Sequence, residues 1–534
     1  MREQTPATHN QDSTGSRYWL DHVVDAVVRE MADGREVIVS TGITPSGPYH
    51  VGHSREILTG DALYKGLKAR GIKVRHLHFV DAYDALRKRY PYLPESYEQE
   101  AGKPVYLVPA PDGKHSSYAE QYFNSYQEAA DMLGVEMEVL WTQDEYIAGR
   151  YADIIVETLQ KRDQVVSILE RISGRAVDDD WQPVQILDET NQSLRTAEFL
   201  SFDAGAQTVQ YRAADGNEYT ADMRKGQVKL DWRCDWPARW KLFGVTVEGF
   251  GREHATKGGS YDTGKAIVEE VYGGIAPIPV PYDTINLKGD SKKMSSSLGN
   301  LVSIQDALTI IPPEILRFFV FKSLPQKQIF FDPGMGMYTL IDEVAKIEEA
   351  EATGQEHEFS QAWGIAKLSA DQACVAQVPF SHLVTVYQTA GGDFDQVLEL
   401  LRRTGHSHAA DTQADVLKRE LGYVERWLKD YAPEQVKFGL QAVGSFHRSL
   451  NTDEIRFLTA LLAKIRSIDG ELSGEAVHTA IYDCAQELGV APKSAFTLLY
   501  EILFGQTTGP RLGHFLASLG REKTLDYLET ALRK

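Results

Sequence analysis

The spacing of hydrophobic residues divides the chain into an amino-terminal part of alternating strands and helices and a carboxyl-terminal part of helices. From Tyr18 to Met31 the apolar residues recur at helical spacing, which predicts a helix. Residues 36–40 form a short apolar run typical of a buried strand, and VGHSREILTGDALYKGLKARG has a helical pattern that ends at Gly71. The next run, KVRHLHFVDAY, predicts a second strand. This order predicts a right-handed crossover in a parallel sheet.

A second set of such elements lies far downstream. VTVEGF predicts a strand, GGSYDTGKAIVEEVYG a helix and VPYDTINL one further strand. The sheet is therefore expected to be split by an insertion at about residues 103–240. Within it, 117–133 and 150–170 have helical patterns, and the segment around 205–219 resembles a polar hairpin.

Strand-like runs nearly disappear after about residue 335, and amphipathic helical patterns continue to the end, as in 415–431, 452–468 and 495–504. The expected fold class is α/β, a doubly wound parallel sheet of Rossmann type that is split by an inserted domain and followed by an all-helical domain. The expected boundaries are a polar tail at 1–16, the halves of the sheet domain at 17–102 and 241–335, the inserted connective domain at 103–240 and the helical domain at 336–534.

Composition narrows the class of protein. A chain of 534 residues with 43% hydrophobic content can bury more than one core. No window approaches a membrane span, and the start MREQTPATHNQDSTGSR lacks the apolar core of a signal peptide, so we expect a cytoplasmic protein without membrane contact. Cys234, Cys374 and Cys484 are far apart, which argues against a disulfide framework and a four-cysteine zinc site.

The formal charge of −20 argues against a protein that holds nucleic acid by bulk electrostatics. A local basic groove remains compatible with this charge. Candidate patches are residues 87–89, 402–408 and 418–419, for which a solvated face is the alternative.

The first candidate site is His50-Val51-Gly52-His53, which lies between a turn rich in glycine and proline and the start of the long helix. Free backbone N–H groups and the positive end of the helix dipole would face an anion here. Gly52 would allow a nucleotide to approach the backbone closely. Histidines three residues apart can both donate hydrogen bonds to a polyphosphate. A capping role for the two histidines is the alternative.

The second candidate site is Lys292-Lys293-Met294-Ser295-Ser296-Ser297, which follows a predicted strand. A lysine cluster in a loop of small residues is a mobile cation that can neutralise the charge of an adenylyl-transfer transition state. An ordinary loop is the alternative. The order of the two segments, one on the first crossover and one after the last strand of a split sheet, favours a functional role for both.

These segments resemble the hallmark motifs of class I aminoacyl-tRNA synthetases, His-x-Gly-His and Lys-Met-Ser-x-Ser. Between about residues 35 and 335 the chain is similar to the lysyl branch of that class, in TGITPSGPYHVGHSREILTGDAL, FVDAYDALRK, LDWRCDWPARW, FGREHATKGGSYDTG, INLKGDSKKMSSSLGN and PPEILRFFVFKSLPQKQIFFDPG. Over the helical remainder the resemblance is one of architecture. It implies a lysine–tRNA ligase that uses ATP and Mg²⁺ to activate L-lysine as lysyl-adenylate and transfers it to the 3′ end of lysine tRNA. It also implies a helical anticodon-binding domain, and we expect a monomer.

The resemblance further implies roles for individual residues. His50, His53 and Lys293 are expected to be catalytic. ATP would contact Pro45, Gly47, His50, Gly52, His53, Lys292, Lys293, Met294 and Ser295, and the amino acid would contact Gly42, Thr44, Asp81, Asp84, Trp232, His254 and Tyr282. These residue types suit the reaction, because adenylate formation depends mainly on positioning and charge stabilisation.

Two of these assignments have alternatives. Trp232 could be a core aromatic of the insertion. Asp81 and Asp84, which follow the second strand, are candidates for one of the two ammonium groups of lysine, but either could cap a helix that begins near Ala85. The sequence does not identify the partner of the lysine side-chain ammonium, which a buried pocket must supply.

The chain departs from the lysyl branch in its insertion. Lysyl enzymes of this class often carry zinc-binding cysteine pairs there, whereas RTAEFLSFDAGAQTVQYRAADGNEYTADMRKGQVKL contains no cysteine. We therefore expect hairpins held by packing, and no bound metal. Ser296 replaces the second lysine of the usual loop motif, which is common in the lysyl branch and does not put activity in doubt.

Three alternative functions stay open at this point. One is glutamyl or glutaminyl specificity within the same class. Another is a duplicated copy that serves a pathway outside translation. The third is a catalytically silent tRNA-binding protein, which the intact His50, His53 and Lys293 disfavour.

Overall fold

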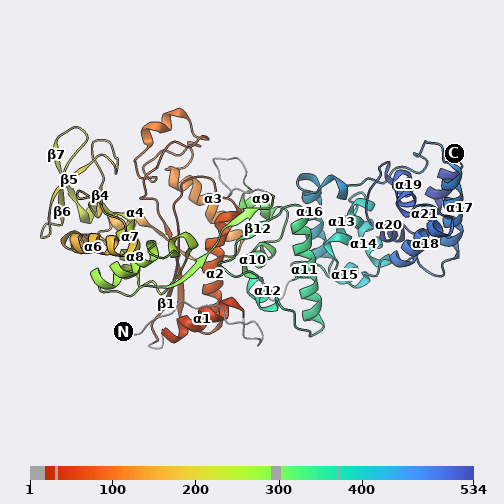
Figure 1. Ribbon diagram of the computed structural model, residues 1–534, viewed down its shortest axis with the longest axis horizontal. Coiled ribbons are helices and arrows are strands. Elements are labelled where there is room, and N and C mark those ends of the chain that lie inside the picture. The colour runs from red at the N-terminus through yellow and green to blue at the C-terminus, as the bar shows by residue number, and fades with distance from the viewer. Residues whose placement is uncertain (1–17, 31–33, 290–301, 370–372, 534) are drawn as a thin grey trace. The chain divides into compact units, whose positions relative to one another are not determined.

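The computed structural model describes residues 18–30, 34–289, 302–369 and 373–533. The chain forms two compact units (Figure 1), of which the first comprises residues 1–304 and 320–330 and the second residues 305–319 and 331–534. In these described residues, no helix has both the length and the apolar composition that a membrane crossing requires.

The first unit is built on a sheet of five parallel strands in the order β10-β9-β1-β2-β3. The strands are β1 (Val37–Ile43), β2 (Val74–Val80), β3 (Glu138–Trp141), β9 (Val247–Gly251) and β10 (Ile278–Tyr282). β1 and β2 pair in register from Val37 opposite Val74 to Ile43 opposite Val80. Because the chain leaves β1 for β2 on one side and later adds β9 on the other, a crevice forms at the carboxyl ends of β1 and β9. The predicted doubly wound α/β fold is confirmed.

Helices cover both faces of this sheet. They are α1 (Trp19–Glu30), α2 (Ser54–Ala69), α3 (Tyr118–Met132), α7 (Trp232–Phe243) and α8 (Ser260–Ala266), the last of which continues as a π-helical turn (Ile267–Val271). Alternate strand side chains point to opposite faces. Thr41 and His78 therefore lie on the side of α2 and α3, whereas Leu77 and Phe79 pack with Trp240 of α7.

β1 extends three residues beyond the strand expected at 36–40, into the stretch that we expected to be a loop. Polar residues mark this end of the strand, Ser40 as the last residue of the predicted strand and Thr41 as the first beyond it, and each has a buried partner within the sheet. The Ser40 hydroxyl donates to Glu248 over 2.9 Å, and the Thr41 hydroxyl lies 2.8 Å from a ring nitrogen of both His76 and His78. The hydrophobic pattern alone therefore underestimates the length of the central strand.

Three further expectations differ from the structure. VPYDTINL forms two strands, β10 and β11 (Ile285–Leu287), because the Asp283 N–H turns away to bond the Pro325 carbonyl over 2.9 Å. The helical stretch at 150–170 is two helices, α5 (Ala152–Gln160) and α6 (Arg162–Ser173), which meet at Lys161. β3 lies within the range expected to be inserted, yet it is an edge strand of the main sheet.

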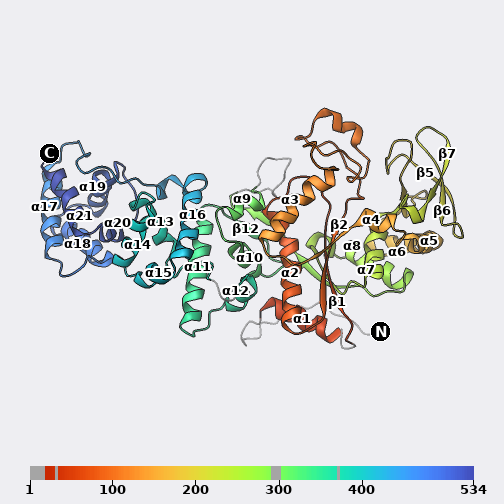
Figure 2. The same cartoon turned by 180° about the vertical axis from the view of Figure 1, so that it is seen from behind.

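The insertion itself contains α4 (Thr142–Ile147), α5, α6 and two small antiparallel sheets. β4 (Val184–Ile186) pairs with β8 (Val228–Leu230), and β5 (Glu198–Asp203), β6 (Thr208–Arg212) and β7 (Glu218–Asp222) form the expected hairpins. Figures 1 and 2 show these hairpins beside α5 and α6, and the Gln207 side chain donates to Asp153 of α5 over 2.6 Å.

A buried carboxylate, Asp188, fastens the turns of this insertion together. It accepts hydrogen bonds from the backbone and hydroxyl of Thr190, from the Thr196 hydroxyl and from the Ala214 N–H, over 2.6 to 2.9 Å. Four hydrogen bonds satisfy both carboxylate oxygens. The turn at 188–196 is thereby linked to the turn between β6 and β7.

The second unit is helical from α11 onward. Its helices are α11 (Met335–Ala352), α12 (Ser360–Ala366), α13 (Phe380–Thr389), α14 (Phe394–Arg403), α15 (Ser407–Thr412), α16 (Ala414–Asp430), α17 (Thr452–Ser467), α18 (Gly474–Glu487), α19 (Pro492–Phe504), α20 (Leu512–Leu519) and α21 (Arg521–Leu532). The last five share a core of leucine, isoleucine and phenylalanine side chains. α9 (Ile304–Leu308), α10 (Pro313–Phe321) and β12 (Ile329–Phe331) lie where the chain passes from one unit to the other.

Arg55 of α2 fixes residues 320–330 within the first unit. Its side chain is fully buried and its guanidinium donates to the carbonyls of Val320, Leu324 and Pro325 over 2.8 to 3.2 Å. Burial lowers the pKa of Arg55 to about 10, so it stays charged at neutral pH. One side chain therefore satisfies several carbonyls at and beyond the end of α10.

Arg55→Met should lower the free energy of unfolding by about 3–5 kcal/mol, because it leaves buried carbonyls without donors. Urea unfolding followed by tryptophan fluorescence measures the change. Arg70→Met is the control, since the exposed Arg70 pairs with Asp21 and Asp25 at the surface, and it should cost less than about 1 kcal/mol. Equal losses for both variants would contradict the role given to Arg55.

Candidate functional site

A cavity of about 1060 Å³ opens at the carboxyl ends of the parallel strands. Most residues that the sequence assigned to a site line it, namely Gly42, Thr44, Gly47, His50, Gly52, His53, Asp81, Asp84, Trp232, His254 and Tyr282. Pro45 is buried and does not line the cavity. Lys292, Lys293, Met294 and Ser295 lie outside the described residues.

The imidazoles of His50 and His53 each accept a backbone hydrogen bond in the 3₁₀ turn Val51–His53, which leads into α2. The Gly52 N–H donates to Nδ1 of His50, and the His50 N–H donates to Nδ1 of His53, each over 3.1 Å. The N–H groups of Val51 and His53 bond backbone carbonyls. The expectation of free backbone N–H groups at this point is therefore wrong, because the two histidines cap the 3₁₀ turn Val51–His53 that leads into α2.

Capping does not remove the histidines from the site, because it fixes how their rings are protonated. Each Nδ1 accepts a backbone hydrogen bond, so the proton of a neutral ring sits on Nε2. Both rings line the cavity with their centroids 4.0 Å apart. The pair is therefore suited to donate Nε2–H bonds to an anionic group.

Gly52 has a specific steric reason to be glycine. A Cβ at this position would lie 2.7 Å from two atoms of the His50 ring. The expected reason was the approach of a nucleotide to the backbone, whereas the structure shows the approach of the His50 imidazole.

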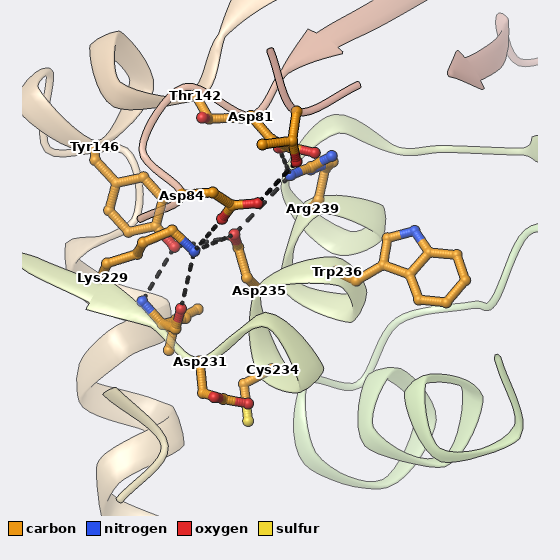
Figure 3. Close-up of polar contacts among 12 residues, drawn as sticks. Asp81, Asp84, Thr142, Tyr146, Lys229, Asp231, Cys234, Asp235, Trp236 and Arg239 are labelled. Atoms are coloured by element: carbon orange, nitrogen blue, oxygen red, sulfur yellow. Dashed lines mark hydrogen bonds and ion pairs between the residues drawn. The ribbon is translucent and has the colours of Figure 1, made fainter. Parts of the chain in front are cut away.

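Asp81 and Asp84 belong to a cluster of charged side chains beside the cavity (Figure 3). Asp81 pairs with Arg239 over 2.5 Å, and Asp84 accepts a hydrogen bond from the Thr44 hydroxyl over 2.9 Å. Burial raises the pKa of Asp81 to about 6, against the opposing effect of Arg239. No helix begins near Ala85, so the alternative that these carboxylates cap one is wrong.

The remaining members of this cluster were not identified from the sequence. Lys229 of β8 lies 3.3 Å from both Asp84 and Asp235, and Asp235 also accepts a hydrogen bond from the Tyr146 hydroxyl over 2.9 Å. Arg239 stacks on the Phe79 ring at 4.5 Å. Asp235 and Arg239 are four residues apart in LDWRCDWPARW, a helical spacing that could have suggested a shared face.

Glu56 is another cavity-lining residue that sequence reasoning missed, although it lies on α2 one turn after His53. One carboxylate oxygen accepts from the Gly42 N–H over 2.7 Å, and the other accepts from the Tyr282 hydroxyl over 2.6 Å. Burial raises the pKa of Glu56 to about 7, while these hydrogen bonds oppose the rise. The described residues supply no ion pair to this carboxylate, which faces the cavity.

Aromatic side chains form another wall of the cavity. Trp232 is 43% exposed, so it is not a core aromatic of the insertion, and its ring lies 6.0 Å from that of His254. Trp236, also missed, contacts His254 at 5.7 Å. The buried Glu248 accepts the indole N–H groups of Trp236 and Trp240 and thereby fixes the orientation of this wall.

No group of three or more histidine, cysteine, aspartate or glutamate side chains in the described ranges is arranged to hold a metal ion. The absence of a structural zinc stays a prediction that elemental analysis of the protein can test.

Comparisons with known proteins support the resemblance. A family described as tRNA synthetases class I (K) matches residues 17–372, and an anticodon binding domain family matches residues 430–532. The chain is 39% identical to lysine–tRNA ligase 1 of Methanosarcina acetivorans, over 94% of this chain and 96% of the relative. It is 38% identical to the lysine–tRNA ligase of Methanosarcina barkeri (96% and 97%) and 34% identical to that of Archaeoglobus fulgidus (96% and 100%).

Gly52→Ala should displace the His50 ring and break the hydrogen bond from residue 52 to Nδ1. A cap of this kind is worth about 1 kcal/mol, so the protein should stay folded. Nitrogen NMR of the histidine rings, which reports the hydrogen bond at Nδ1, measures the change. Gly422→Ala, which places a Cβ in open space, is the control. Unchanged His50 signals in Gly52→Ala would contradict the packing argument.

Proposed function

The chain belongs to the class I (K) family of tRNA synthetases, and from that premise we propose that it joins L-lysine to ATP as lysyl-adenylate and transfers the lysyl group to the 3′ end of lysine tRNA. The relatives reported above are lysine–tRNA ligases, so glutamyl or glutaminyl specificity loses its support. We place this activity in the cytoplasm, in a monomer whose carboxyl-terminal helices bind the anticodon.

The main support for this proposal is that the carboxylate of Glu56 lines the cavity. An ammonium group brought out of water needs a negatively charged partner. Glu56 is held by Gly42 and Tyr282 and takes part in no ion pair among the described residues. The hydroxyl of Tyr49, which lines the same cavity, is buried and has no hydrogen-bond partner within the described part of the chain. We assign Glu56 and Tyr282 to the side-chain ammonium of lysine.

The α-ammonium of lysine is assigned to Asp84. Of the two candidates, Asp81 is 23% exposed and bound tightly by Arg239, whereas Asp84 is 37% exposed beside the cavity. The faces of Trp232 and His254 would pack on the aliphatic part of the substrate. Gly42 and Thr44 also line the cavity. A side chain at position 42 would be crowded, because its Cβ would lie 3.2 Å from the Phe79 carbonyl.

We assign the triphosphate to the start of α2. The Nε2–H groups of His50 and His53 can donate to phosphate oxygens, and Gly47 and Gly52 line the same part of the cavity. Mg²⁺ binds readily through substrate phosphates and waters with few protein ligands, which suits a cavity without a metal-binding cluster in its described part. Bound there, the ion would offset the triphosphate charge. The residues of the chain would hold the lysine carboxylate in line with the α-phosphorus.

Aminoacylation of a tRNA pool with lysine as the only amino acid tests the proposal. Formation of lysyl-tRNA is the expected result. Charging with glutamate but not with lysine would overturn it.

Lys293→Ala should slow adenylate formation about 10²–10³-fold, the loss usual for one preorganised charge-stabilising group. ATP affinity should change much less, because the lysine acts in the transition state. Single-turnover formation of adenylate, with tRNA present, measures the rate. Lys225→Ala, an exposed lysine of the insertion, should have no effect. Equal losses of ATP affinity and of rate would show that Lys293 binds ATP equally in the ground state and in the transition state, which would contradict this prediction.

Lysine binding should weaken as the pH falls below about 7, where Glu56 becomes protonated and neutral. Once the pH is well below the pKa, kcat/KM for lysine should fall about tenfold per pH unit. Glu56→Gln should abolish this inflection and weaken binding on the order of 100-fold. Glu138→Gln, which changes an exposed partner of Arg75, should keep the wild-type profile. A persisting inflection in Glu56→Gln would assign the titration to another group.

A further inference from the structure

Lys229 is a buried cation of the insertion whose ammonium lies among acidic side chains at the amino-acid pocket. Its side chain is 3% exposed, and it stands on β8, next to the start of α7. The ammonium lies 3.3 Å from Asp84, 3.3 Å from Asp235 and 3.3 Å from the Leu230 carbonyl (Figure 3). An ammonium has three N–H donors. Two N–H groups donate to Asp235 and to the Leu230 carbonyl, and Asp84 is an ion-pair partner, so the ammonium is engaged by groups of the protein.

We infer that Lys229 is a positioning residue for lysine recognition, which holds Asp84 against Thr44 so that the carboxylate is preset to receive the α-ammonium of the substrate. This inference rests on the proposed function, in which Asp84 is the α-ammonium partner. It adds a residue from the inserted part of the chain that acts on the substrate only through another side chain.

The charges of the cluster support this role. Among the side chains joined by these ion pairs, Asp81, Asp84 and Asp235 carry three negative charges, and Lys229 and Arg239 carry two positive charges, which leaves one negative charge. Arg239 is directed to Asp81 at 2.5 Å and lies 3.9 Å from Asp235. Lys229 is therefore the cation that pairs with Asp84. The remaining negative charge is matched when the substrate brings its ammonium.

The exposed fractions of the three aspartate side chains indicate which carboxylate can receive the substrate ammonium. The Asp235 side chain is 7% exposed and Asp81 23%, whereas Asp84 is 37% exposed beside the cavity. Asp84 has one oxygen on Lys229 and the other on the Thr44 hydroxyl. Two fixed partners hold the carboxylate in one orientation, which lowers the entropy that substrate binding would otherwise cost.

Lys229 is itself held firmly and stays charged. The Tyr146 hydroxyl donates to Asp235 and accepts the N–H of Leu230, the residue after Lys229. Burial lowers the pKa of Lys229, but Asp235 and Asp84 outweigh this effect and raise the pKa above its ordinary value. The cation is therefore present throughout the physiological pH range.

The test compares Lys229→Met with Lys225→Met. Lys225 is an exposed lysine of the same insertion, 3.8 Å from Asp222. Calorimetry with a non-hydrolysable lysyl-adenylate analogue gives the affinity, and aminoacylation gives KM for lysine and kcat. In Lys229→Met we expect the affinity for the analogue to fall about 10- to 100-fold and KM for lysine to rise, with a smaller change in kcat. Lys229→Arg should recover part of the loss, and Lys225→Met should match the wild type.

A second variant separates positioning from folding, because Lys229→Met alone leaves the buried Asp235 carboxylate without the lysine cation. Lys229→Met with Asp235→Asn removes one negative charge together with the positive one. This double variant should melt near the wild-type temperature and still bind the analogue weakly. A folded double variant with wild-type affinity would overturn the inference.

Asp84→Asn distinguishes the inference from the proposal on which it rests. Weak binding in Asp84→Asn and in the folded double variant supports both. Weak binding in Asp84→Asn with wild-type binding in the double variant overturns only the role of Lys229. Wild-type binding in Asp84→Asn removes Asp84 as the α-ammonium partner and overturns the inference with it.

Discussion

The site depends on one constraint, which is that charges gathered at the carboxyl ends of β1 and β2 must be matched inside the protein. A buried ion is tolerated only beside an opposite charge and hydrogen bonds. Here the partners come from different segments, since Asp81 and Asp84 follow β2, Lys229 stands on β8, and Asp235 and Arg239 lie on α7. Matching these charges fixes the insertion and α7 against the end of the sheet. The cavity is the space that remains between them, so its shape follows from the charge pairing.

The sequence predicted the parallel sheet and the main positions of the site because both depend on local patterns. Strand and helix periods place the histidines at the start of α2, and the cavity lies where the strand order reverses. The partners of each charge could not be predicted in this way, since Asp81 and Arg239 are 158 residues apart. Thr41 was taken for the start of a loop because the residues that satisfy its hydroxyl, His76 and His78, come from another strand. What sequence reasoning missed was therefore the pairing between distant segments.

Packing and hydrogen bonds together hold the small sheet of the insertion. Val209 and Tyr211 of β6 pack into a hydrophobic core with α5 and α6, and the sheet also has a cross-link between its turns. Asp188 provides one with hydrogen bonds alone, to Thr190, Thr196 and Ala214. Unlike a cysteine cluster, this link does not depend on redox state or metal supply. It also keeps the turn at 188–196, whose Leu194 and Arg195 line the cavity, in a fixed place.

The backbone hydrogen bonds accepted by His50 and His53 determine which nitrogen of each ring can contact another group. Each Nδ1 must keep a lone pair to accept its backbone N–H. A proton on Nδ1 of either ring would occupy that lone pair and break the hydrogen bond that orients the ring. Nε2 is therefore the nitrogen through which either ring can bind a group outside this turn.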